Sequence, residues 1–93
     1  MKKSKAYKSV WDALSDTPAE AANMQARSDL MHQIRELIRK KKWTQTEAAR
    51  RCGVTQPRIS DLMRGEISLF SLDALVKIAA ALGQRVRVDL EAA

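Results

Sequence analysis

The stretch that decides the fold is QTEAARRCGVTQPRISDL, residues 45–62, whose pattern predicts two short helices joined by a tight turn. Thr44 and Glu47 form the T-x-x-E pair that caps a helix start reciprocally. Gly53 predicts the end of this first helix, because glycine adopts the left-handed conformation at little cost. Thr55 is a favourable cap for the second helix.

Apolar spacing predicts that the two helices cross at a steep angle around shared inward positions. Those positions are Ala48, Cys52, Val54, Ile59 and Leu62. Ala49 is small where the helices approach most closely, and a bulkier residue there would push them apart. The outward face of the second helix is polar and consists of Gln56, Pro57, Arg58, Ser60 and Asp61. A recognition helix presents such groups to base edges.

Residues 44–65, TQTEAARRCGVTQPRISDLMRG, resemble the helix-turn-helix of the Cro/C1-type, or XRE, family. The match includes Ala49, Gly53 and the inward apolar positions. A wider pattern, from VWDALSDTPAEAANMQARSDLM to LFSLDALVKIAAALG, resembles small XRE antitoxins of the HigA type and covers nearly the whole chain after its basic start. The resemblance implies an all-α, lambda-repressor-like helix-turn-helix bundle with a long N-terminal helix.

Composition agrees with one small domain that has a polyanionic partner. The 93 residues are 45% hydrophobic but only 4% aromatic, so the core must consist of aliphatic side chains and methionine. The net charge of +6 suits phosphate neutralisation. Basic small domains without a nucleic-acid partner are also common, so the charge by itself leaves both interpretations open.

Catalytic and metal chemistry has no support in the sequence. The single cysteine, Cys52, allows no internal disulfide, which agrees with a reducing cytoplasm, and its position predicts a core residue rather than a nucleophile. His32 is the only histidine, and metal-ligand spacing, a Gly-rich phosphate loop and a nucleophile beside a base are all absent. We therefore expect no enzyme, cofactor, metal site or membrane span, and a cytoplasmic, nucleoid-associated protein.

Residues 1–16 are predicted to form a basic, partly disordered N-terminal arm with a short helical turn. Four lysines occur in residues 1–8, which either touch DNA or form a solvated tail. The turn is VWDAL, residues 10–14, and exposing its tryptophan is unfavourable. This turn either docks on its own domain or contacts a partner protein.

The helix-turn-helix DNA-binding domain is predicted to span residues 17–83 and to open on a long helix. Thr17 caps it, Pro18 is its first residue, and the helix runs to about Lys41. Its buried stripe consists of Leu30, Ile34, Leu37 and Ile38. The first half is weakly amphipathic and reaches beyond a compact bundle, so it is a candidate contact for a dimer or a toxin. The basic end, residues 39–42, opposes the helix dipole or holds DNA phosphates.

Gly65 predicts the end of the recognition helix, and the following loop is expected to direct Leu69 and Phe70 inward. Ser71 then caps a last helix over residues 72–82, which Gly83 closes. Its apolar stripe predicts core packing.

The C-terminal segment, residues 84–93, is predicted to be a short β-strand for dimerisation. Val86, Val88 and Leu90 alternate with charged residues, which is the period of a half-buried strand. A lone strand leaves its backbone groups unpaired. Pairing with the same strand of a second chain resolves this and predicts a homodimer, whereas a frayed tail is the alternative.

These features predict a sequence-specific repressor that binds double-stranded DNA at a palindromic operator. The Gln56 side chain can form hydrogen bonds with adenine, and the Arg58 side chain can form them with guanine. Pro57 offers only van der Waals contact, for example to a thymine methyl. Ser60 and Asp61 are further candidates for base contacts. The candidates for phosphate contacts are Thr44, Gln45, Thr46, Thr55 and Arg64.

The resemblance to HigA-type antitoxins implies a protein partner as well. That partner would be a RelE-like or HigB-like mRNA interferase, which a type II antitoxin neutralises while repressing its own operon. The alternative is a stand-alone phage-type or chromosomal XRE regulator with no toxin. An adaptor that has lost DNA binding is disfavoured by Gln56, Arg58 and the basic charge.

Overall fold

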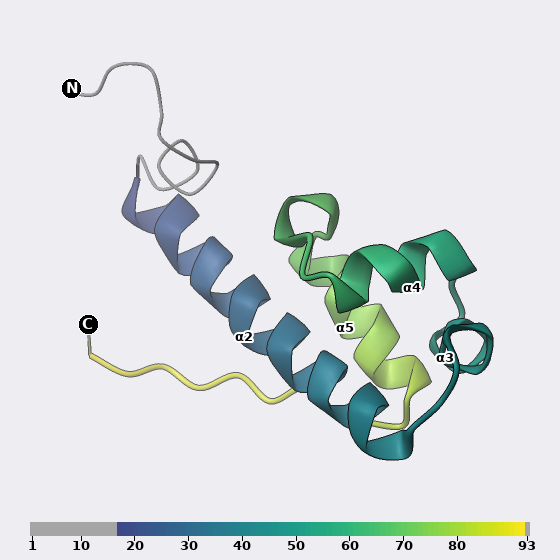
Figure 1. Ribbon diagram of the computed structural model, residues 1–93. Coiled ribbons are helices and arrows are strands. Elements are labelled where there is room, and N and C mark those ends of the chain that lie inside the picture. Colours follow the sequence, from purple (N-terminus) through teal and green to yellow (C-terminus); the bar gives the residue numbers. More distant parts are fainter. Residues whose placement is uncertain (1–16, 93) are drawn as a thin grey trace, which may run out of the picture.

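The computed structural model describes residues 17–92, which form four α-helices and one short 3-10 helix (Figure 1). In chain order they are α2 (Pro18–Lys41), α3 (Gln45–Cys52), α4 (Gln56–Met63), η1 (Ile67–Leu69) and α5 (Leu72–Ala81). The predicted N-terminal arm and the predicted turn at residues 10–14 lie outside the described residues. The all-helical prediction is confirmed for residues 17–92.

The long helix α2 begins and ends where local signals predict. The Thr17 hydroxyl accepts a hydrogen bond from the Glu20 N–H at 3.0 Å, and Pro18 is the first helical residue. At the other end Lys42 adopts the left-handed conformation, with φ of 59°, and its N–H donates to the carbonyls of Ile38 and Arg39. Figure 1 shows the N-terminal half of α2 extending beyond the bundle that the shorter helices form.

One core, which is aliphatic apart from Phe70 and two sulfur-containing side chains, holds the helices together. Its buried members are Met31, Ile34, Ile38, Ala48, Ala49, Cys52, Ile59, Leu62, Phe70, Leu75, Ile78 and Ala79. All the inward positions predicted for the stretch 45–62 belong to this core or pack against it. In the predicted stripe of α2, Ile34 and Ile38 are fully buried, whereas Leu30 and Leu37 are half-buried. Each fully buried isoleucine, leucine, methionine or phenylalanine contributes about 1.5–3 kcal/mol to folding stability relative to an exposed one.

The last helix, α5, confirms its predicted start and differs by one residue at its end. The Ser71 hydroxyl accepts from the Ala74 N–H at 3.0 Å. Leu82 is the capping residue instead of the last helical one, and Gly83 follows with φ of 78°.

The loop after α4 corrects one prediction. Phe70 is buried, with 1% of its surface exposed, but Leu69 is 48% exposed instead of packing inward. Within the 3-10 helix η1 it is Ile67, and not Leu69, that packs against the core. Arg27 of α2 holds this arrangement by donating to the carbonyls of Ile67 and Phe70, both at 3.2 Å.

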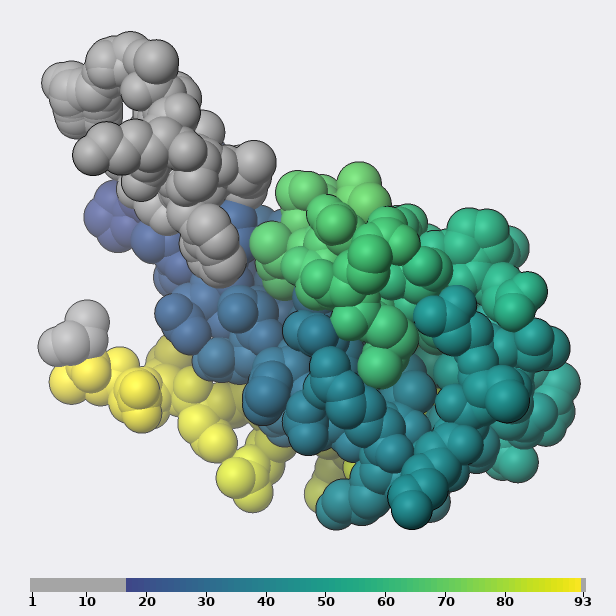
Figure 2. All heavy atoms as spheres, viewed as in Figure 1, coloured from purple at the N-terminus to yellow at the C-terminus, as the bar shows by residue number. Residues whose placement is uncertain are grey.

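The predicted C-terminal strand is absent from the single chain, because residues 84–92 have no regular secondary structure. Val86 packs against the core, whereas Val88 and Leu90 are 81% and 99% exposed. Figure 2 shows this segment extending away from the helical body. A strand requires a neighbour that completes its hydrogen bonds, and the rest of residues 17–92 supplies none.

Candidate functional site

The candidate site is the surface formed by α3, the turn and α4. Two threonine caps build its frame. The Thr44 hydroxyl accepts from the Glu47 N–H at 3.1 Å, and the Thr55 hydroxyl accepts from the Arg58 N–H at 3.4 Å. Gly53 ends α3 with φ of 70°, as predicted. Each helix therefore has the start that its sequence encodes.

The reciprocal half of the Thr44 cap is not formed, which corrects the T-x-x-E prediction. The Glu47 carboxylate instead accepts from Arg50 at 2.5 Å and from Arg51 at 2.6 Å. These hydrogen bonds, from Arg50 first, hold the pKa of the Glu47 carboxyl below its usual value. Arg51 also lies over the Trp43 ring, 5.1 Å from its centroid, so the positive charge of α3 is largely engaged within the protein.

A side-chain hydrogen bond ties α3 to α4 at the exposed surface. The Gln56 amide nitrogen donates to the Thr46 hydroxyl oxygen at 2.8 Å. Between the two helices, Ala49 of α3 is buried, and its carbonyl accepts from the Val54 N–H of the turn at 3.0 Å. The bond orients the Gln56 amide and leaves its carbonyl oxygen and second N–H available to a ligand.

The outward face of α4 presents the five predicted base-reading side chains, which differ in exposure. Gln56 and Pro57 are exposed, whereas Arg58, Ser60 and Asp61 are half-buried. All five come from one helix, so the structure brings them together.

Arg64 links two of these side chains. It donates to the Ser60 hydroxyl at 2.6 Å and to the Asp61 carboxylate at 2.7 Å, and it lies 3.7 Å from the Glu66 carboxylate. The Asp61 charge is thereby compensated inside the protein. This network was not predicted, although the spacing of three and four residues on one helix is its sequence signal.

Arg58 has a different partner. Its guanidinium carbon lies 4.0 Å from the centroid of the Phe70 ring, which is the geometry of a cation–π contact. Sequence reasoning placed Phe70 inward but missed this role, because the two residues are twelve positions apart on different elements and share no periodic pattern.

The predicted phosphate-binding residues lie at the two helix starts and at the end of α4. Thr44, Gln45, Thr46, Thr55 and Arg64 are all exposed. The first turn of α3 also offers backbone N–H groups that lack helical partners, which favours an anion. Beyond these positions, Lys40, Lys41 and Lys42 are exposed at the end of α2.

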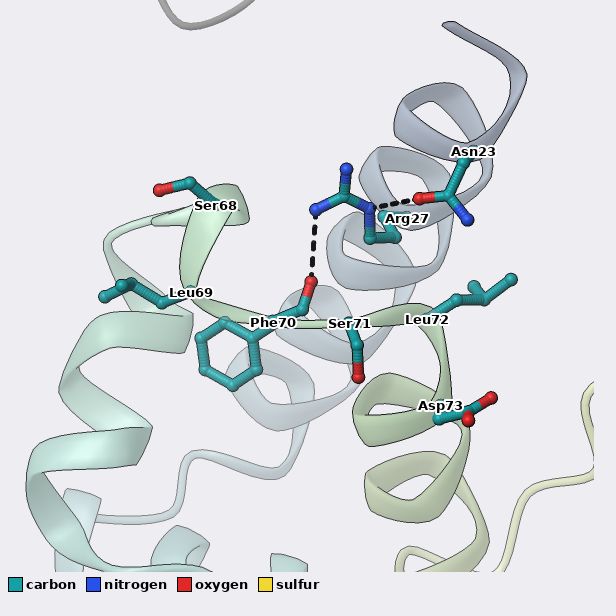
Figure 3. A pocket seen from close by; sticks show the side chains of 8 residues that line it. All are labelled: Asn23, Arg27, Ser68, Leu69, Phe70, Ser71, Leu72 and Asp73. Atoms are coloured by element: carbon teal, nitrogen blue, oxygen red, sulfur yellow. Dashed lines mark hydrogen bonds between the residues drawn. The ribbon is translucent and has the colours of Figure 1, made fainter. Parts of the chain in front are cut away.

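A groove lies between α2 and the segment that leads into α5. Its volume is about 490 Å³. It is lined by Asn23, Arg27, Ser68, Leu69, Phe70, Ser71, Leu72 and Asp73 (Figure 3). Arg27, its only cation, is already bonded to Asn23 and to backbone carbonyls, so its donors serve the fold.

Residues 17–92 contain no cluster of three or more His, Cys, Asp or Glu side chains that could hold a metal ion. Cys52 is buried, and desolvation raises the pKa of its thiol to about 11. The reactive thiolate is therefore scarce at neutral pH. Within the same residues, no helix is both long enough and apolar enough to cross a bilayer.

Comparison with known proteins agrees with this geometry. A family model described as a helix-turn-helix domain matches residues 13–91 of the chain. No curated protein matches the sequence. The match supports the helix-turn-helix predicted from residues 45–62, while the XRE and HigA-type parts of the resemblance stay predictions.

Proposed function

Because the chain belongs to the helix-turn-helix domain family, we propose that it is a sequence-specific DNA-binding repressor and not an enzyme. The observation that carries this proposal is the outward face of α4. Gln56 and Arg58 lie on this face. Among residues 17–92, their side-chain N–H groups donate neither to a carboxylate nor to a backbone carbonyl. A helix inserted into the major groove presents such a face to base edges.

The roles of individual residues follow from their chemistry. Gln56 reads adenine with the oriented amide, Arg58 reads guanine, and Pro57 contacts a thymine methyl. Ser60 and Asp61 add base contacts at the far end of the helix. Register is set by phosphate contacts from Thr44, Gln45, Thr46, Thr55 and Arg64.

A homodimer on a palindromic operator completes the proposal. A single domain makes few base contacts, and two copies read half-sites about 34 Å apart. The exposed Val88 and Leu90 supply the apolar face for pairing the C-terminal segments of two chains as strands.

We further propose that the protein is the antitoxin of a type II pair that neutralises a RelE-like mRNA interferase. The supporting observation is the N-terminal half of α2, where residues 17–23, 25 and 26 are exposed on a helix that extends beyond the bundle (Figure 1). Such a helix offers a surface that the fold itself leaves uncovered. The sequence resemblance to HigA-type antitoxins supports the same partner.

The testing experiment is a gel shift on DNA from upstream of the protein's own gene, at fixed salt, with and without the product of the adjacent gene. Arg58→Ala is the test variant, and Lys77→Ala is the matched control, because Lys77 is an exposed cation on α5 outside the α3–α4 surface. We expect Arg58→Ala to weaken specific binding by about 1–3 kcal/mol and to relax one base position. Lys77→Ala should bind as the unmodified protein does.

The outcomes separate the two functions. A specific shift that the neighbouring product supershifts supports an autoregulating antitoxin. A shift that is indifferent to that product indicates a stand-alone regulator without a toxin. Equal binding by Arg58→Ala and the unmodified protein would refute the assignment of Arg58.

A further inference from the structure

The contact between Arg58 and Phe70 sets Arg58 apart from the other arginines of the α3–α4 surface. Arg50, Arg51 and Arg64 each donate to a carboxylate. The Arg58 side chain makes no hydrogen bond or ion pair within residues 17–92, and its guanidinium rests on an aromatic face at 4.0 Å. It is also half-buried, so α4 holds it against the domain.

Stacking leaves the recognition chemistry of an arginine intact. A guanidinium is planar, and its five N–H donors point outward in that plane, whereas a cation–π contact uses only its face. A stacked arginine therefore keeps the paired donors that match the O6 and N7 acceptors of guanine. It also loses fewer rotamers on binding than a mobile side chain does.

The ring beneath Arg58 is itself fixed from two sides. Phe70 is 1% exposed, so the core encloses the part of the ring that Arg58 does not cover. Its carbonyl accepts from Arg27 of α2 at 3.2 Å, and its N–H donates to the Ile67 carbonyl at 3.2 Å. Figure 3 shows the carbonyl directed toward Arg27 and the ring directed away from it.

We propose that Phe70 is a specificity-determining positioning residue, which holds the Arg58 guanidinium in the orientation that reads a base. This inference rests on the proposed DNA-binding function and deepens it. Phe70 itself touches no base. Its effect on recognition passes entirely through Arg58.

The test is selection from a pool of random-sequence duplexes with the full chain and three variants: Arg58→Ala, Phe70→Leu and the double variant. Phe70→Leu keeps an apolar side chain in the core but removes the aromatic face. We expect it to lower base preference about 3- to 10-fold, only at the position that Arg58→Ala also relaxes. The double variant should lose no more at that position than Arg58→Ala alone.

Stability needs its own control, because Phe70 is a core residue. Ile78→Val removes one buried methylene from α5, a helix that contains neither Arg58 nor Phe70. Thermal unfolding ranks the variants by stability. Ile78→Val should unfold at a lower temperature than the unmodified protein and yet select the same base pattern. A merely structural role for Phe70 would give Phe70→Leu that same result.

Ring-current shifts of the Arg58 side-chain protons in the unmodified protein provide a measurement that does not depend on a folded variant. We expect these shifts in the free protein and in the complex with a selected duplex. Their loss on binding would overturn the proposal, as would an unchanged base pattern for folded Phe70→Leu. If the unmodified protein enriches no sequence, the proposed sequence-specific DNA binding is refuted. If it does enrich a sequence, the results for the variants test the role of Phe70 alone.

Discussion

Asp61→Asn tests whether the outward face of α4 approaches DNA. In residues 56–66 the charges of Arg58 and Arg64 cancel those of Asp61 and Glu66, so the substitution changes the local net charge from zero to +1. Asp61 and Arg64 form a pair 2.7 Å apart whose side chains are 26% and 57% exposed. Such a surface pair contributes at most about 1 kcal/mol, so the free energy of unfolding should change little.

The effect on DNA binding should be larger than the effect on stability. Removing one carboxylate near a phosphate relieves roughly 1 kcal/mol of repulsion in water, which corresponds to about fivefold in affinity at low salt. Without the Asp61 carboxylate, the whole charge of Arg64 can neutralise the phosphate that Arg64 is proposed to contact. The plot of log K against log salt should therefore become steeper by about 0.9.

Fluorescence anisotropy with a labelled random-sequence duplex, titrated at several salt concentrations, measures both quantities. Asp73→Asn is the matched control, because it makes the same change in total charge at an exposed position in the first turn of α5. Equal responses of the two variants would mean that only net charge matters. That result, or no response from Asp61→Asn, would refute the placement of α4 against DNA.

Three further predictions concern stability and assembly. Gly53→Ala and Gly65→Ala both place a side chain at positive φ, at a cost of about 1–2 kcal/mol. Chemical denaturation should show the larger loss for Gly65→Ala, because its new methyl would lie 3.1 Å from Arg35 Nη1 whereas that of Gly53 meets nothing within 4 Å. Since the pKa of the Cys52 thiol rises from 9.0 to about 11 on folding, stability should fall by at most roughly 3 kcal/mol as pH rises through this interval. Cys52→Ala should abolish that alkaline component of the unfolding curve, and a persistent slope would exclude Cys52 as its source. Deleting residues 85–93 should weaken the dimer, and an unchanged mass by light scattering at micromolar concentration would contradict strand pairing.

Helix boundaries were determined by signals that act within one turn of the chain. Thr17, Thr44, Thr55 and Ser71 each accept a hydrogen bond from the N–H three residues later. Such a contact depends only on a short side chain and its immediate neighbours, so the sequence alone predicts it. The inward positions of the stretch 45–62 were equally predictable, because a helix repeats every 3.6 residues.

Other features depend on residues that are distant in the sequence. The tertiary fold brings Phe70 beneath Arg58 and brings Arg27 to the Phe70 carbonyl, 43 residues away. No periodic pattern marks such pairs, since the packing of whole helices decides which side chains meet. The same packing turned Ile67 inward and left Leu69 exposed.

The sequence by itself therefore determined where the helices begin, where they turn and which faces they bury, because caps, glycines and apolar spacing act locally. Only the tertiary structure decided how two side chains of the polar face of α4 are oriented: Gln56 is tied to Thr46 of α3, and Arg58 lies over the ring of Phe70. The physical reason is that long polar side chains have many rotamers of similar energy. Their final orientation is selected by the partners that the folded chain places within reach.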